Sequence, residues 1–195
     1  MAKINFYHGT MGSGKSLDLI RTAYNYKERG MDILVYKPDI DTREGTGLCK
    51  ISTRVGMSLK AEWIKPHYEI PNMIVVDSTV QGIRPSVIII DECQFLTEEQ
   101  VNGFQAWSIA NDVPLIFYGL KVDFTGHLFP GSKRLFEIAD RVVELKGICH
   151  CGSVARQNAR VIDGKIEKTG EVVSIGGNEL YTALCNKCFY ENNLG

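Results

Sequence analysis

Gly9-Thr-Met-Gly-Ser-Gly-Lys-Ser16 is the stretch that decides the fold of this 195-residue chain. It satisfies the pattern G-x-x-x-x-G-K-[ST], and it follows a short apolar run, Lys3 to Tyr7. Apolar residues at helical spacing come after it, so we predict a strand, a glycine-rich loop and a helix that ends near Gly30. Backbone N–H groups of such a loop, together with the helix N-terminus, surround phosphate oxygens. The motif therefore predicts nucleotide binding.

The side chains of this loop have separate predicted roles. Lys15 neutralises phosphate charge, and the Ser16 hydroxyl can ligate magnesium. We assign the whole motif to ATP binding: Gly9, Thr10, Met11, Gly12, Ser13, Gly14, Lys15 and Ser16.

The remaining apolar runs predict an α/β domain. Four of them are interpreted as further strands: Ile33 to Tyr36, Val87 to Ile90, Leu115 to Tyr118 and Val142 to Leu145. Thr97 and Gln100 form a capping-box signature for a helix that fades near Asn111, and a short helix passes through Leu135. The segment Asp39 to Ser58, rich in Thr, Gly and charge, is interpreted as a mobile loop. This alternation predicts a parallel sheet of the P-loop NTPase, RecA-like type with helices on both faces.

Two carboxylates follow the β-branched run Val87 to Ile90. In a parallel sheet Asp91 would lie at the same edge as the phosphate loop, where we expect it to hold magnesium through water. Glu92 is one residue further and can point toward an acceptor hydroxyl, which makes it the candidate general base. The alternative is that both acids belong to a solvated turn.

Four cysteines mark a second unit. Cys149-x-Cys151 and Cys185-x-x-Cys188 are separated by 33 residues, and two thiolate pairs give the tetrahedral sulfur site that zinc prefers. His150 is a possible substitute ligand, and four reduced buried cysteines are the alternative. Four protein ligands would make a closed, structural zinc site. We predict a P-loop nucleotide-binding domain at residues 1–147 and a small zinc-binding domain at residues 148–195.

The overall composition indicates which kinds of binding partner to expect. The 22 Lys and Arg nearly cancel the 23 Asp and Glu, so no global field attracts DNA or an anionic membrane. The chain carries no signal-peptide pattern at its start and no apolar stretch of membrane-spanning length. We expect a soluble, cytoplasmic protein with a small-molecule substrate and no nucleic-acid or membrane partner.

Together these residues resemble the thymidine kinase family whose members carry a zinc-stapled lasso, and the resemblance spans nearly the whole chain. Its pieces are the phosphate loop, the run Asp91-Glu-Cys-Gln-Phe95, Tyr118-Gly-Leu120, the two cysteine pairs and Ile175-Gly-Gly177. The resemblance implies that Glu92 takes the proton from the 5'-hydroxyl of thymidine. It also implies that Asp91 and Ser16 serve Mg²⁺, and it places Gln94 with the nucleotide-binding residues.

The resemblance further implies a nucleoside pocket. We expect its lining from these residues: Met11, Arg54, Phe95, Leu120, Phe124, Phe129, Val172, Val173, Ser174, Ile175, Gly176 and Tyr181. Without the family, the phenylalanines would be ordinary core residues and the Gly-Gly segment an ordinary hairpin. Asn158 departs from the Thr or Ser that several relatives carry near the base. The implied activity is ATP-dependent phosphorylation of thymidine and deoxyuridine in nucleotide salvage. Family members are commonly tetramers, so the resemblance also implies a homotetramer.

Two other functional classes stay open on the residues alone. A phosphate loop with an Asp-Glu-x-Gln strand end also suits a nucleic-acid-stimulated ATPase, although the charge balance and the 48 residues after the first domain argue against a motor. A zinc-ribbon binding module without catalysis is the second, and the complete phosphate loop argues against it.

Overall fold

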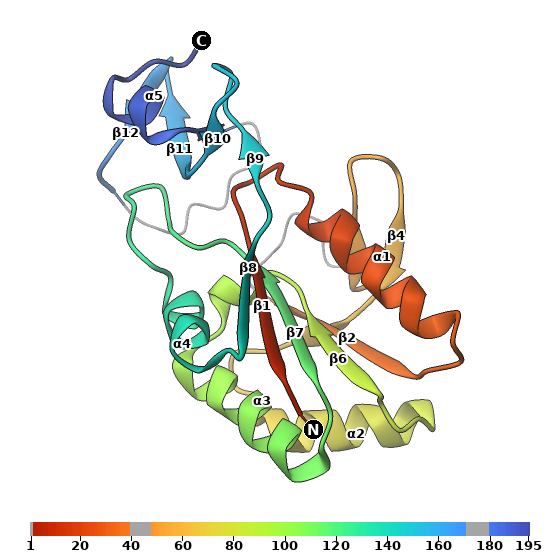
Figure 1. Ribbon diagram of the computed structural model, residues 1–195. Coiled ribbons are helices and arrows are strands. Elements are labelled where there is room, and N and C mark those ends of the chain that lie inside the picture. The colour runs from red at the N-terminus through yellow and green to blue at the C-terminus, as the bar shows by residue number, and fades with distance from the viewer. Residues whose placement is uncertain (1, 40–47, 171–179) are drawn as a thin grey trace.

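A six-stranded parallel sheet forms the centre of the protein. The computed structural model describes residues 2–39, 48–170 and 180–195 (Figure 1). The strand order is β5-β2-β6-β7-β1-β8, and every pair in it is parallel. The strands have these bounds: β1 Ile4–His8, β2 Ile33–Pro38, β5 Glu62–Ile64, β6 Val87–Ile90, β7 Leu115–Gly119 and β8 Arg141–Glu144. The predicted parallel α/β sheet is confirmed.

Helices cover both faces of this sheet, as predicted. The bounds are α1 Lys15–Lys27, α2 Ile70–Gln81, α3 Glu98–Asn111 and α4 Pro130–Ile138. Alternate strand residues divide between two cores: Phe6 and Ile88 pack with α2, α3 and α4, whereas Val35 and Ile89 pack with α1. Right-handed crossovers explain the division, because the chain moves across the sheet in opposite directions from β1 to β2 and from β2 through β6 to β7.

The capping box before α3 is present. The Thr97 hydroxyl accepts the Gln100 N–H at 3.2 Å, and the Gln100 carboxamide oxygen accepts the Thr97 N–H at 3.1 Å. The helix ends at Asn111, and Asp112 follows in a left-handed conformation with φ 53°. Start and end of this helix were therefore both predicted from local residue types.

The interpretation of Asp39 to Ser58 as a loop is wrong in part. Its last residues form an antiparallel hairpin, β3 Lys50–Ser52 with β4 Ser58–Lys60, while residues 40–47 lie outside the described part. Each strand buries a single apolar side chain, Ile51 or Leu59, in the core beside α1. One apolar residue per strand is too few to produce a period-two signal.

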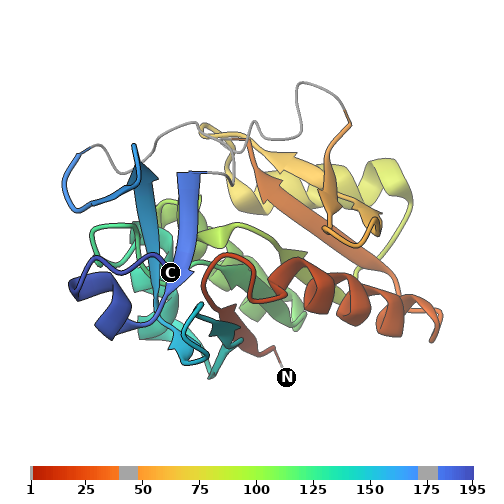
Figure 2. The same cartoon turned by 90° about the horizontal axis from the view of Figure 1, so that it is seen from above.

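A smaller β-rich module follows the sheet. Its elements are β9 Gly147–Ile148, β10 Val154–Ala155, β11 Gln157–Ile162, β12 Lys165–Glu167, β13 Tyr181–Leu184 and α5 Asn186–Tyr190. Strands β12, β11 and β13 form an antiparallel sheet, and the module has its own core, which includes Cys149, Cys185, Cys188 and Phe189. Figures 1 and 2 show the module at the carboxyl ends of β1 and β8. No described helix is both long and apolar enough to cross a membrane.

Candidate functional site

The loop between β1 and α1 has the geometry of a phosphate cradle. Gly12 and Gly14 have φ of 74° and 84°, the left-handed region that favours glycine. A Cβ on Gly9 would lie 2.3 Å from the Leu145 carbonyl oxygen, so no side chain fits there. Lys15 Nζ donates to the carbonyl oxygens of Gly9 at 3.2 Å and Thr10 at 2.9 Å. The glycines of the motif therefore allow a tight turn around the lysine ammonium.

Two hydroxyl groups in this loop are buried without a described partner. Thr10 Oγ1 and Ser13 Oγ make no hydrogen bond within the part of the chain that the structure covers. Burying an unsatisfied hydroxyl costs free energy, so such atoms are typical of a binding site whose ligand supplies the missing partner. Phosphate oxygens are acceptors and fit both donors.

Asp91 begins the turn after β6, at the same edge of the sheet as the phosphate loop. Only β7 separates β6 from β1, so two strand spacings, roughly 10 Å, lie between them. Asp91 is 3% exposed. Burial, and then the nearby charge of Glu92, raises the pKa of Asp91 to about 7, while the ammonium of Lys15 acts in the opposite direction. A carboxylate in this state gains from a divalent cation, which would stabilise its ionised form.

Glu92 is held by its backbone and by a glutamine. It has φ 49° and ψ 37°, a conformation that few non-glycine residues adopt. Gln94 Nε2 donates to Glu92 Oε2 at 2.7 Å, and Gln94 Oε1 accepts the Leu120 N–H at 3.0 Å. Gln94, predicted as a nucleotide-binding residue, is 1% exposed and joins Glu92 to the end of β7. Its visible effect is to orient the Glu92 carboxylate.

The aromatic residues predicted for the nucleoside pocket fall into two groups. Phe95 and Phe129 form an edge-to-face pair with ring centroids 5.8 Å apart. Phe124 is 2% exposed, and the guanidinium of Arg160 lies over its ring at 5.4 Å. Arg160 belongs to β11 of the C-terminal module, where it pairs with Tyr181 in β13. The contact between Arg160 and Phe124 therefore joins the module to the first domain.

Two more predicted substrate residues, Arg54 and Leu120, lie in the described part of the chain. Arg54 follows β3, and its Nη1 lies 4.0 Å from the position that a Cβ on Gly12 would take, so the hairpin brings a cation to the phosphate loop. Leu120 is half-buried, and its carbonyl oxygen accepts the Ser132 hydroxyl at 2.5 Å. Residues 172–176, which include Val172, Val173, Ser174, Ile175 and Gly176, lie outside the described residues.

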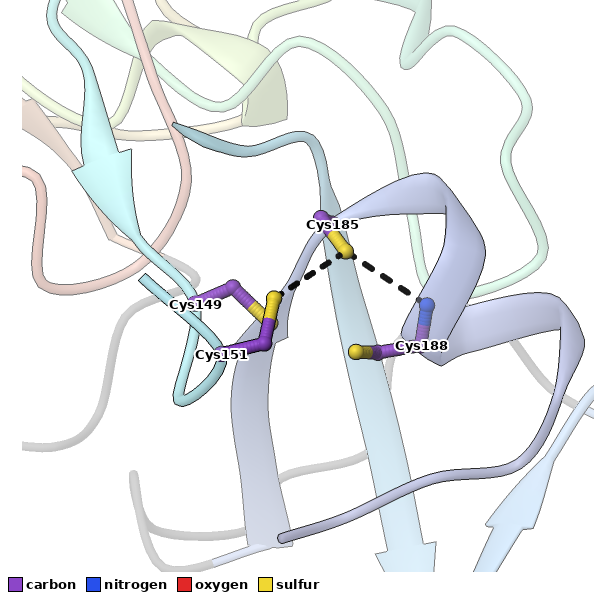
Figure 3. Close-up of side chains that lie close together, drawn as sticks. All are labelled: Cys149, Cys151, Cys185 and Cys188. Carbon is purple, nitrogen blue, oxygen red and sulfur yellow. Dashed lines mark hydrogen bonds between the residues drawn. The ribbon is translucent and has the colours of Figure 1, made fainter. Parts of the chain in front are cut away.

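The four predicted metal ligands form one cluster (Figure 3). The sulfur atoms of Cys149, Cys151, Cys185 and Cys188 all lie within 4.8 Å of one another, and Cys151 Sγ is 3.7 Å from Cys185 Sγ. Tetrahedral zinc with Zn–S bonds of about 2.3 Å requires sulfur separations of roughly 3.8 Å. Hydrogen bonds from Ser153 lower the pKa of Cys151 to about 6. The cluster could therefore hold a metal ion, and its donor set fits structural zinc.

His150 does not replace any of these ligands. Its Nε2 lies 3.1 Å from the Asn193 carbonyl oxygen, outside the sulfur cluster. The cysteines are positioned by short elements: Cys149 follows β9, and Cys185 caps α5 by accepting the Cys188 N–H at 3.4 Å. Local turns at both pairs thus bring two cysteine pairs with 33 residues between them into one site.

Comparison with known proteins identifies the family of the chain. The model of the family described as thymidine kinase matches residues 2–189. The chain belongs to the thymidine kinase family. It is 43% identical to a thymidine kinase of Shewanella oneidensis over 98% of both chains. It is 42% identical to a thymidine kinase of Yersinia pseudotuberculosis, covering 98% of this chain and 96% of the relative. The corresponding protein of Escherichia coli O157:H7 is 41% identical over 98% of this chain and 92% of its own.

Within this thymidine kinase family member, two residues take positions that the sequence did not predict. Asn158 Oδ1 accepts the Met11 N–H of the phosphate loop at 2.7 Å. Arg160, two residues along the same strand, lies over Phe124. Spacing of two in a strand places both on one face, which is the only sequence signal that could have linked them.

Proposed function

We propose that the protein is an ATP:thymidine 5'-phosphotransferase that also accepts deoxyuridine and serves nucleotide salvage. Family membership over residues 2–189 carries the proposal, because the relatives at 41–43% identity are named thymidine kinases. The site supports it, since a phosphate loop and a carboxylate pair lie at one sheet edge. Family membership also favours this reading over a nucleic-acid-stimulated ATPase.

The phosphate loop is proposed to bind the triphosphate of ATP. Backbone N–H groups of Gly12 to Ser16 and the N-terminus of α1 would face the phosphates. Lys15 would exchange its two carbonyl acceptors for phosphate oxygens, and the partnerless Thr10 and Ser13 hydroxyls support this location. Ser16 and Asp91 are proposed to hold Mg²⁺, which would offset the charge of the phosphates.

Glu92 is proposed to act as the general base. Its carboxylate would accept the proton of the nucleoside 5'-hydroxyl as that oxygen bonds to the γ-phosphorus and the bond to ADP breaks. Gln94 supports this role because its hydrogen bond at 2.7 Å holds Glu92 Oε2 in one place. Phosphoryl transfer depends on positioning and charge stabilisation, so no covalent nucleophile is required.

The nucleoside is proposed to bind between the sheet edge and the C-terminal module. Phe124, Phe95 and Phe129 would supply apolar surface for the base. Met11, Leu120 and Tyr181 are proposed to line the same pocket, as the family resemblance implies. Arg54 is proposed to approach the phosphates from the β3-β4 hairpin, since it lies beside Gly12. Residues 172–176 are proposed to contact the pyrimidine edge through backbone groups, as the family resemblance implies.

The remaining assignments are proposals of the same kind. The boundary between residues 1–147 and 148–195 is supported by the separate core of the C-terminal module. Structural zinc would hold that module together without entering the reaction. We further propose a homotetramer in the cytoplasm, as the family resemblance implies. We also propose that it has no nucleic-acid or membrane partner, and the net charge of −1 supports this point. Native mass spectrometry and cell fractionation test these points.

One transfer assay tests the activity. Purified, zinc-loaded protein is supplied with γ-labelled ATP and, separately, thymidine, deoxyuridine, deoxycytidine or single-stranded DNA. Label should appear in the monophosphates of thymidine and deoxyuridine. Release of labelled phosphate that depends on single-stranded DNA, without labelled nucleotide, would instead support the ATPase.

A further inference from the structure

The C-terminal module contacts two consecutive residues of the phosphate loop. Asn158 in β11 accepts the Met11 N–H with its Oδ1 at 2.7 Å. Gly147 in β9 lies against the preceding residue, because a Cβ on Gly147 would be 2.5 Å from Thr10 Oγ1. Gly147 at the domain boundary and Asn158 within the module therefore contact the loop at Thr10 and Met11.

Both contacting residues lie close to proposed zinc ligands, one along the chain and one through a strand pair. Gly147 is two residues before Cys149 in the chain. On the other side, β11 pairs with β13 in the register Gln157 to Leu184 and Asn158 to Ala183, and Cys185 follows Leu184. The ladder between β11 and β13 thus ties the position of Asn158 to that of a ligand. Release of the metal would free both attachments at once.

The alternation of β11 separates its two tasks. Ala159 is fully buried in the core of the module, next to the cysteines. Asn158 and Arg160 are two residues apart, the period at which strand side chains share a face, and they contact Met11 and Phe124. Asn158 is 4% exposed, so its bond to the loop is shielded from water and is stronger than a surface bond.

We propose that Asn158 is a positioning residue through which the C-terminal module orders the phosphate loop, so that metal loading and nucleotide affinity are coupled. The proposal rests on the proposed zinc and ATP sites, and it goes beyond them because it assigns the metal an effect on the phosphate site. Oδ1 of Asn158 fixes Met11 N–H, which leaves the following loop amides in one arrangement before ATP arrives. By linkage, bound nucleotide must then raise the affinity for the metal by the same factor.

Nucleotide binding to the zinc-loaded full chain tests this directly. Asn158→Leu removes the acceptor at similar volume, and we expect the Kd for MgATP to rise roughly tenfold, as for loss of one shielded hydrogen bond. Asn186→Leu is the matched control, because Asn186 is exposed in the same module and, within the described residues, its side chain accepts a single hydrogen bond, from Gln157 Nε2 at 3.4 Å. It should bind MgATP like the wild type. An unchanged Kd in folded, zinc-loaded Asn158→Leu protein would overturn the proposal.

Two further measurements separate coupling from a merely structural role. In an equilibrium competition with a chromophoric chelator, the Kd of the wild type for zinc should be about tenfold lower when ADP is present, and Asn158→Leu should lose that difference. If the variant does not fold, amide hydrogen exchange of residues 9–16 in the wild type decides, because removing zinc should speed it about tenfold. Unchanged exchange, or a zinc Kd that is the same with and without ADP, would refute coupling. Failure of thymidine phosphorylation alone would refute the proposed function and leave this coupling intact.

Discussion

Replacing Glu92 by glutamine removes a proton acceptor and little else. Gln and Glu have nearly the same shape, and an amide oxygen can still accept the Gln94 Nε2–H that now reaches Glu92 Oε2 at 2.7 Å. The left-handed backbone at position 92, with φ 49°, is equally costly for both residues. We therefore expect Glu92→Gln to fold, to load zinc and to bind both substrates within about threefold of the wild type, a change below 1 kcal/mol.

The rate should fall far more than the binding. A positioned general base contributes about 100- to 10,000-fold, which corresponds to roughly 2.7 to 5.4 kcal/mol of activation free energy. Because Gln94 and Leu120 keep position 92 in place, we expect kcat to decrease within that range while KM stays nearly constant. Such a pattern indicates an interaction that is made only in the transition state.

Initial rates of label transfer from ATP to thymidine measure kcat, and calorimetric titration measures each affinity. Glu98→Gln is the control, because it makes the same chemical change at an exposed position in the first turn of α3. That control should keep wild-type kinetics. A Glu92→Gln protein that retained more than about a tenth of the wild-type kcat would refute the assignment of Glu92 as base.

Three further predictions follow from burial and contacts. Burial raises the pKa of Asp91 from 3.8 to about 7 in the folded protein, so ionisation of Asp91 lowers the stability of the fold as pH rises between these two values. Asp91→Asn should therefore increase the free energy of unfolding by at least about 1 kcal/mol at pH 8, which raises Tm by roughly 2 to 4 °C. The same variant should leave the stability unchanged at pH 4. An equal gain at both pH values in thermal melts would contradict this. Cys185→Ser should lower zinc content by metal analysis and reduce thymidine phosphorylation to a weak or absent level, and unchanged turnover would refute the role of the site. Phe124→Ala should raise the KM for thymidine about tenfold, with the Kd for MgATP unchanged, and the reverse pattern would move Phe124 out of the nucleoside pocket.

Much of the central domain could be predicted because its signals are local. The run Val87 to Ile90 is buried on both faces, so its composition alone distinguishes it as a central parallel strand. Thr97 and Gln100 bond to each other across one helical turn, which makes the start of α3 readable from four residues. The short hairpin Lys50 to Lys60 was missed because its pairing depends on burial beside α1, which its own residues do not reveal.

For the candidate site, the sequence by itself determined which residues come together in short patterns. The turn Gly9 to Ser16 requires glycines at fixed spacing, and the four thiols come as two close pairs, so short-range patterns predicted both clusters. Only the tertiary structure decided what those atoms face: Gln94 turns toward Glu92, and Asn158 reaches Met11 across 147 positions in the chain. A hydrogen bond between distant residues depends on how two packed units meet, and no local pattern records that meeting.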